Sequence, residues 1–303
     1  MATAKTATQS KPQKATSAPA PAASKGELTT RPAADLVPAS ALDFAEDAGR
    51  GMENADSDTF AIPFLAVLQK GSPQVDEDSG AAIEGAKAGM FFNTGTQGLL
   101  DGREKGVLFI PCAFRRVFLR WTPREAANGG FKGEYTPEEV AAMRDKGQIV
   151  EVDGRLYAPD AEGNVNPKKQ DRFSDTRNHY GLLLDDDGNA QQILLSLTST
   201  QVKKSKSLMT MLSNVRIQRK APGEGSYTPP TFANVVRIKT IAESNDKGTW
   251  AGVTFTIEGR VQSQEQYALA KAFNAQVAKG RVTANYDEGA ADGGDSGGTA
   301  GGF

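Results

Sequence analysis

GVLFIPCAFRRVFLRW, residues 106–121, is the stretch that decides the fold. It is rich in β-branched and aromatic residues and is interrupted by Pro111, a pattern more typical of a long strand than of a helix. Side chains alternate between the two faces of a strand. The alternation predicts one face with Arg116, Phe118 and Arg120, and an opposite face with Arg115, Val117, Leu119 and Trp121.

Strand and turn patterns also surround this stretch. Residues 89–94 predict a short strand that runs into a Gly-rich turn. Three hairpins are predicted at residues 149–157, 180–197 and 232–261, with turns at Asp-Gly, Asp-Asp-Asp-Gly-Asn and Asn-Asp-Lys-Gly sequences. In the last strand apolar residues alternate with threonine and glutamate, which indicates a sheet with one wet face.

Helices are fewer and short. Thr136 and Glu139 form a capping-box pattern with proline at the first helical position, which predicts a helix to about residue 146. Further helices are predicted over residues 199–214 and 263–279. The expected fold is therefore mainly β: an OB-like barrel elaborated with extra hairpins and a few short helices.

The two ends of the chain have a different composition from the body. Residues 1–40 are mostly Ala, Lys, Thr, Ser, Pro and Gln and carry a basic excess, whereas residues 286–303 are Gly-rich and acidic. Neither segment has enough apolar surface to offset the entropy of ordering, so both are expected to be disordered. The predicted organisation is a basic arm (1–40), a β-rich nucleic-acid-binding body (41–285) and a flexible acidic tail (286–303).

Few residues could support catalysis or hold a cofactor. The chain has one cysteine, Cys112, and one histidine, His179. Cys112 lies in an apolar strand, and the two residues cannot build a usual zinc site. We expect no enzymatic activity, no cofactor and no metal. The single cysteine fits a reducing cytoplasm, and no apolar run approaches the length that a membrane span needs.

Two acidic clusters leave one enzymatic alternative open. Asp76-Glu77-Asp78 and Asp185-Asp186-Asp187 could supply oxygen ligands to magnesium, as in a nuclease. Both lie in turn-like contexts beside Gly or Ser, which favours solvated turns.

The first candidate nucleic-acid segment is the strand of residues 106–121 itself. Its arginines stand beside aromatic residues, and single-strand grooves combine phosphate-neutralising cations with aromatic faces on which bases stack. The alternative is a buried barrel strand with arginines at its rim. The candidate residues are Arg115, Arg116, Phe118, Arg120 and Trp121.

The second candidate segment, residues 196–220, has six cations and no acid. Its serines and threonines could also meet phosphate oxygens. At helical spacing Val202, Leu208, Met209, Leu212 and Val215 form an inward stripe that leaves the lysines outside it. The alternative is a solvated helix face. The candidate residues are Lys203, Lys204, Lys206, Arg216, Arg219 and Lys220.

Four stretches resemble a family of phage-encoded early or DNA-metabolism proteins over residues 60–280: FAIPFLAVLQKGSPQ (60–74), AGMFFNTGT (88–96), residues 106–121, and LLSLTSTQVKKSKSLMTML (194–212). A β-rich body with an acidic tail that ends in phenylalanine is similar to single-stranded-DNA-binding proteins of phages and bacteria. The resemblance implies an OB-fold, sequence-independent DNA binding and a tail that contacts replication partners. The tail departs from that pattern, because its acids are sparse and no proline precedes Phe303.

The expected function is therefore single-stranded-DNA binding during phage replication or recombination, in the cytoplasm of an infected bacterium. Phe303 would be the contact to a replication or recombination partner, and no membrane is involved. A non-enzymatic virion or scaffold protein is the main alternative, and a metal-dependent nuclease a lesser one.

Overall fold

The structure, a computed structural model, describes residues 46, 50–53, 61–123, 126, 128–219, 225–246, 248–282 and 284–286. The chain divides into two compact units, residues 1–53 and 54–303. Almost all described residues belong to the second unit, and the fold below is that of this unit. The predicted arm (1–40) and nearly all of the predicted tail (286–303) lie outside the described residues, so these boundaries stay predictions.

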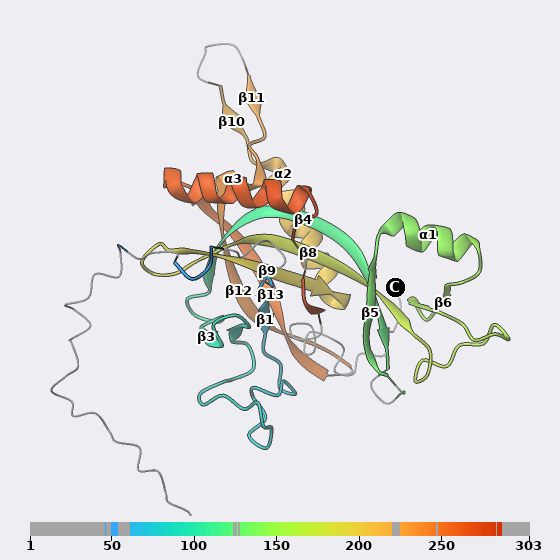
Figure 1. Cartoon of the computed structure of the whole chain (residues 1–303). Coiled ribbons are helices and arrows are strands. Elements are labelled where there is room, and N and C mark those ends of the chain that lie inside the picture. The colour runs from blue at the N-terminus through green and yellow to red at the C-terminus, as the bar shows by residue number, and fades with distance from the viewer. Residues whose placement is uncertain are drawn as a thin grey trace, which may run out of the picture. The chain divides into compact units, whose positions relative to one another are not determined.

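An antiparallel sheet of eight strands is the main element of this unit (Figure 1). Its order is β13-β12-β4-β8-β7-β6, with β5 paired to β4 and β9 paired to β8. The strands are β4 (Val107–Thr122), β5 (Gly130–Tyr135), β6 (Val150–Val152), β7 (Arg155–Tyr157), β8 (Arg172–Leu184), β9 (Ala190–Thr198), β12 (Asn234–Asn245) and β13 (Gly248–Arg260).

The three predicted hairpins are β6–β7, β8–β9 and β12–β13. In the first of them Asp153 and Gly154 both have positive φ, 50° and 72°, as a tight turn between twisted strands requires. Two smaller sheets accompany the large one. They are formed by β1 (Leu65–Val67), β2 (Phe91–Asn93) and β3 (Gly98–Leu100), and by β10 (Ile217–Gln218) and β11 (Ser226–Tyr227).

A bulge in β4 exchanges the two faces of that strand. The pairing with β8 shifts between Pro111 and Ala113, where proline has no N–H to donate to the ladder. Before the bulge the even-numbered Ile110 contributes to a buried apolar cluster, and beyond the bulge the odd-numbered Val117 and Leu119 contribute to the same cluster. The alternation predicted for residues 115–121 is confirmed because that stretch lies wholly beyond the bulge.

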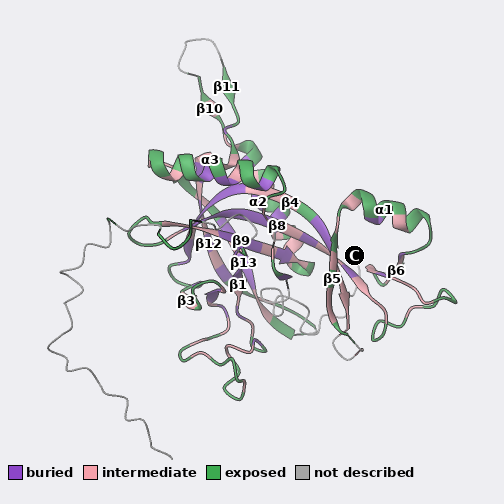
Figure 2. Ribbon diagram, in the orientation of Figure 1, coloured by how far each residue is buried: buried purple, intermediate pink, exposed green. Residues whose placement is uncertain are grey.

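Three helices cover the sheet: α1 (Pro137–Asp145), α2 (Val202–Asn214) and α3 (Gln264–Ala278). The capping box of Thr136 and Glu139 is present at the start of α1. On α3 the buried residues are Ala270, Phe273 and Val277, spaced to form one inward stripe. Figure 1 shows α3 lying along β4, and Figure 2 shows the buried residues concentrated on the strands beneath it.

The two faces of the large sheet belong to separate cores. One core joins Ile110, Cys112 and Leu182 to α3. The other joins Phe109 and Ile193 to α2 and to the β1–β3 sheet. A third, smaller core lies at the far end of β4, where Phe118 and Phe173 meet α1.

The mainly β class, with added hairpins and few short helices, is confirmed. The pairings of the described strands differ from a closed barrel: they run from β13 to β6, and no ladder joins the outer strands to each other. The physical reason is that β4 and β8 are long enough to pair with different neighbours at their two ends, so the sheet branches. No described helix has the length and apolar character of a membrane span.

Candidate nucleic-acid interface

Arg115 lies on the face of β4 that packs beneath α3. Its Nη2 donates to the carbonyl oxygen of Val277 in the last turn of α3, and its guanidinium lies 5.8 Å from the centroid of the Tyr180 ring. The last carbonyls of a helix have no partner within the helix. Arg115 therefore caps α3, and its contact with phosphate stays a prediction.

Arg116 and Arg120 are paired with acids that follow later in the chain. The Nε and Nη2 atoms of Arg116 lie 3.2 and 2.9 Å from the carboxylate oxygens of Asp175, which Arg177 also contacts. Arg120 Nε lies 2.6 Å from Asp171 Oδ2. These pairs lower the positive charge that this end of β4 presents to solvent.

The two aromatic candidates of β4 are packed against other rings. Phe118 is only 7% exposed, within the core that it shares with Phe173. The Trp121 ring meets Phe131 edge-on at a centroid distance of 5.5 Å. Stacking of a base on Phe118 would require that core to open, and the stacking role of Phe118 stays a prediction. Trp121 is half-buried.

Two of the three lysines of α2 lie on its exposed side, as the helical spacing predicts. Leu208 and Leu212 are buried, whereas Lys203 and Lys206 are exposed. Among the described residues no ion pair involves either exposed lysine. Lys204 is different, because its Nζ lies 2.7 Å from Glu243 Oε1 on β12. Burial alone would raise the pKa of the Glu243 carboxyl, but hydrogen bonds from Lys204, Gln201 and Trp250 outweigh it and lower that pKa.

The hairpin β10–β11 extends from the end of α2 (Figure 1). Arg216 Nη1 donates to the carbonyl oxygen of Ser213, 2.6 Å away, and to the hydroxyl of Thr228, so it fixes the hairpin to the helix. Arg219 lies 5.2 Å from the centroid of Tyr227 on the opposite strand. Tyr227 is 40% exposed, which leaves an arginine and an aromatic ring together at the surface.

Of the predicted cations, Lys203, Lys206, Arg216 and Arg219 are exposed along α2 and the hairpin that follows it, and the structure adds the exposed ring of Tyr227. We call these five residues the α2–hairpin surface. No Asp or Glu occurs between residues 188 and 223. Sequence reasoning missed Tyr227, although its position after a Gly-rich turn and opposite a basic strand was a signal for a hairpin. Lys220 and Phe303, also predicted as contacts, lie outside the described residues.

His179 and Cys112 are both buried in the described core. His179 Nε2 shares a 2.8 Å hydrogen bond with Ser205 Oγ on α2. Burial, aided by the charge of Arg177, lowers the pKa of His179 to about 4. Burial raises the pKa of the Cys112 thiol to about 12. Neither the imidazole of His179 nor the thiol of Cys112 is therefore an exposed base or nucleophile, and both side chains act as packing groups.

The acidic clusters stabilise the turns in which they lie, because their carboxylates accept hydrogen bonds from nearby residues of the same turn. Asp185 accepts hydrogen bonds from the backbone and side chain of Asn189, both at 2.8 Å, and Asp186 pairs with Lys105. Asp76 accepts from the backbone N–H of Asp78 at 3.2 Å. In the part of the chain that the structure describes, no group of three or more His, Cys, Asp or Glu could hold a metal ion.

A family model described as Pam3 phage gp34-like protein matches residues 31–283. No curated protein matches the chain, and no solved structure matches it.

Proposed function

The chain belongs to the Pam3 phage gp34-like family, and from that premise we propose that it binds single-stranded DNA without sequence preference and without catalysing a reaction. The α2–hairpin surface is the observation that supports the proposal: exposed cations and an exposed aromatic ring, in a stretch that has no Asp or Glu between residues 188 and 223. Its setting would be phage replication or recombination in the cytoplasm of the infected bacterium.

Each part of this surface fits one part of a single strand. Lys203 and Lys206 project from an exposed helix face, where they can contact successive phosphates of a strand. Such contacts are favourable because they release the counterions that the phosphates hold. Tyr227 offers a ring face to a base, which only an unpaired strand can present. Arg219 already covers part of that ring, so we expect a base to add to the existing cation–aromatic stack.

The first prediction concerns the nucleic acid itself. The protein should bind a fluorescein-labelled oligothymidine more tightly than a duplex of the same length, as measured by fluorescence anisotropy. Its affinity should fall steeply between about 50 and 200 mM salt, because counterions compete for the phosphates. Equal affinity for both substrates would contradict single-strand preference. Absence of binding at low salt would contradict the function and favour a virion or scaffold protein.

The second prediction locates the site. Replacing Lys203, Lys206 and Arg219 together by alanine should weaken oligothymidine binding roughly tenfold and reduce the salt slope by about 2, at about 0.7 per lost phosphate contact. These side chains are exposed, so the fold should survive. The matched control removes the same charge elsewhere: Lys146→Ala, Lys168→Ala and Lys169→Ala, all exposed and outside the α2–hairpin surface. Equal losses in the two triple variants would show that only net charge matters.

A further inference from the structure

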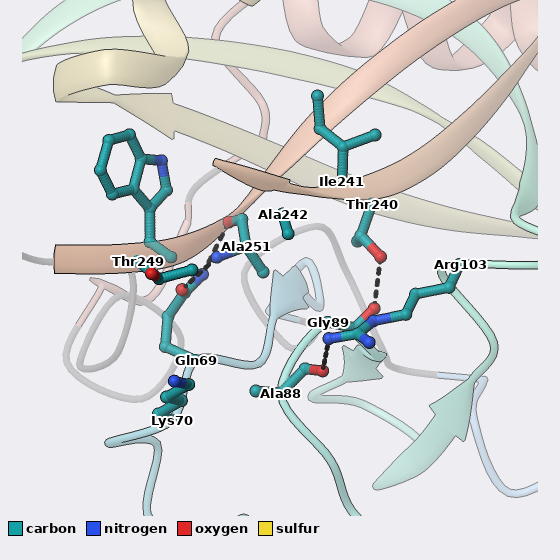
Figure 3. Close-up of a pocket in the computed structure, with 11 residues that line it drawn as sticks. Gln69, Lys70, Ala88, Gly89, Arg103, Thr240, Ile241, Ala242, Thr249 and Ala251 are labelled. Atoms are coloured by element: carbon teal, nitrogen blue, oxygen red, sulfur yellow. Dashed lines mark hydrogen bonds between the residues drawn. The ribbon is translucent and has the colours of Figure 1, made fainter. Parts of the chain in front are cut away.

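Helix α2 is fixed in place at its first turn. Glu243 on β12 accepts from Gln201 Nε2 at 3.0 Å and pairs with Lys204 at 2.7 Å. The β12–β13 hairpin that carries Glu243 is itself bonded to a connecting segment. Figure 3 shows the Gln69 side chain against Ala251 of β13, where it donates to the carbonyl oxygen and accepts from the N–H, both at 2.9 Å. The exposed lysines of α2 therefore project from a helix whose position is set.

One exposed stripe leads along α2 from these lysines to the end of the helix. Its residues are all exposed and follow a spacing of three, four and three positions, which places them on one side of the helix: Lys203, Lys206, Thr210 and Ser213. At 1.5 Å per residue the stripe is roughly 15 Å long. Cations and hydroxyl groups are the side chains that commonly meet phosphate. A single strand that follows the stripe from Lys203 therefore reaches Ser213, next to the last residue of α2.

The hairpin β10–β11, which leaves α2 at this end, has little packing to hold it. Its strands pair at two positions, Ile217 with Tyr227 and Gln218 with Ser226. None of its described residues, 216–219 and 225–228, is buried. A two-stranded hairpin is marginally stable by itself in water. The direction in which the hairpin projects from α2 (Figure 1) therefore depends on the residues at its base.

Arg216 and Thr228 form the joint at that base, one before the first strand and the other after the second. Arg216 Nη1 donates to the carbonyl oxygen of Ser213 at 2.6 Å and to the hydroxyl of Thr228. Thr228 Oγ1 also lies 3.4 Å from the same carbonyl oxygen. A carbonyl in the last turn of a helix has no partner within the helix, so the joint uses an acceptor that α2 leaves free. One guanidinium group therefore ties both ends of the hairpin to the end of the helix.

We propose that Arg216 and Thr228 are positioning residues of the single-strand site. Their joint holds the Arg219–Tyr227 pair within reach of the strand that the exposed lysines of α2 bind. A hairpin that is already held loses less conformational freedom when DNA binds, and the affinity is higher for that reason. This inference rests on the proposed function. It lets Arg216 act through the hairpin, whereas the sequence suggested a direct contact with phosphate.

Thr228→Val tests the joint without changing the charge of the protein. It removes the hydroxyl and keeps a side chain of similar shape. The affinity for oligothymidine, measured by anisotropy, should fall roughly three- to tenfold, as the loss of one hydrogen bond predicts. Thr228→Ser keeps the hydroxyl and should bind as the wild type does. The matched control is Thr256→Val, at an exposed threonine of β13 outside the α2–hairpin surface, which should also bind as the wild type does.

A double-mutant cycle shows whether the joint acts through the hairpin. In a protein that carries both Arg219→Ala and Tyr227→Ala, the hairpin has lost the side chains that the joint presents. Adding Thr228→Val to that protein should weaken binding by less than about twofold, because two changes to one unit are not additive. A full three- to tenfold loss in that background would overturn the positioning role.

The outcomes separate the joint from the function. If the wild type binds oligothymidine and Thr228→Val binds equally well, the positioning role is wrong and DNA binding stands. If Thr228→Ser binds as weakly as Thr228→Val, the hydroxyl is not what holds the hairpin, and the positioning role is again wrong. If the wild type fails to bind by anisotropy, the proposed function and the positioning role fall together.

Discussion

Replacing Phe273 by alanine is expected to lower the free energy of unfolding by about 3–5 kcal/mol, the usual cost of removing a buried phenylalanine ring. Phe273 is fully buried and meets the Tyr180 ring edge-on at a centroid distance of 6.5 Å. It is the largest side chain in the inward stripe of α3. Its loss leaves a cavity between that helix and β4 and β8, and the neighbouring side chains can fill it only in part.

Leu269 gives a matched control on the same helix. It is 40% exposed, so Leu269→Ala should cost less than about 0.5 kcal/mol. Urea unfolding followed by far-UV circular dichroism measures both. Similar costs for the two variants would contradict the burial of Phe273 and the placement of α3 against the sheet.

The second large effect is a loss of stability in mild acid, caused by His179. The buried ring titrates at about pH 4, whereas in the unfolded chain it titrates near pH 6.5. Between these values the unfolded chain binds the additional proton, so this contribution to stability is complete above about pH 6.5 and is lost as the pH falls. From pH 7 to pH 5 the loss should be about 2 kcal/mol.

This effect can be isolated because the chain has only one histidine and most carboxylates titrate below pH 5. Urea unfolding of the wild type and of His179→Gln at pH 7 and pH 5 measures it. The variant will be less stable at pH 7, since Ser205 loses its native partner, but its pH dependence should shrink to less than half. An unchanged pH dependence in the variant would assign the loss to other groups.

Much of the fold could be predicted from the sequence, because the signals are local. The turn at Asp153 and Gly154, the capping box at Thr136 and the inward stripe of α2 each depend on residues a few positions apart. Such patterns predict elements well, since turn geometry and helix spacing are properties of short segments. The short strands β10 and β11 were missed because two-residue strands have no periodicity to detect.

The sequence by itself determined the mainly β class, the hairpins and the exposed lysines of α2, whereas only the tertiary structure decided which charges remain unpaired. Residues 106–121 contain three arginines and no acid, yet Arg116 and Arg120 have carboxylate partners 59 and 51 residues away. Those acids arrive through the pairing of β4 with β8, and a cross-strand partner is set by register, which no local window contains. Lys203 and Lys206 have no such partner among the described residues, because they project from the exposed side of a helix rather than from a sheet with neighbouring strands.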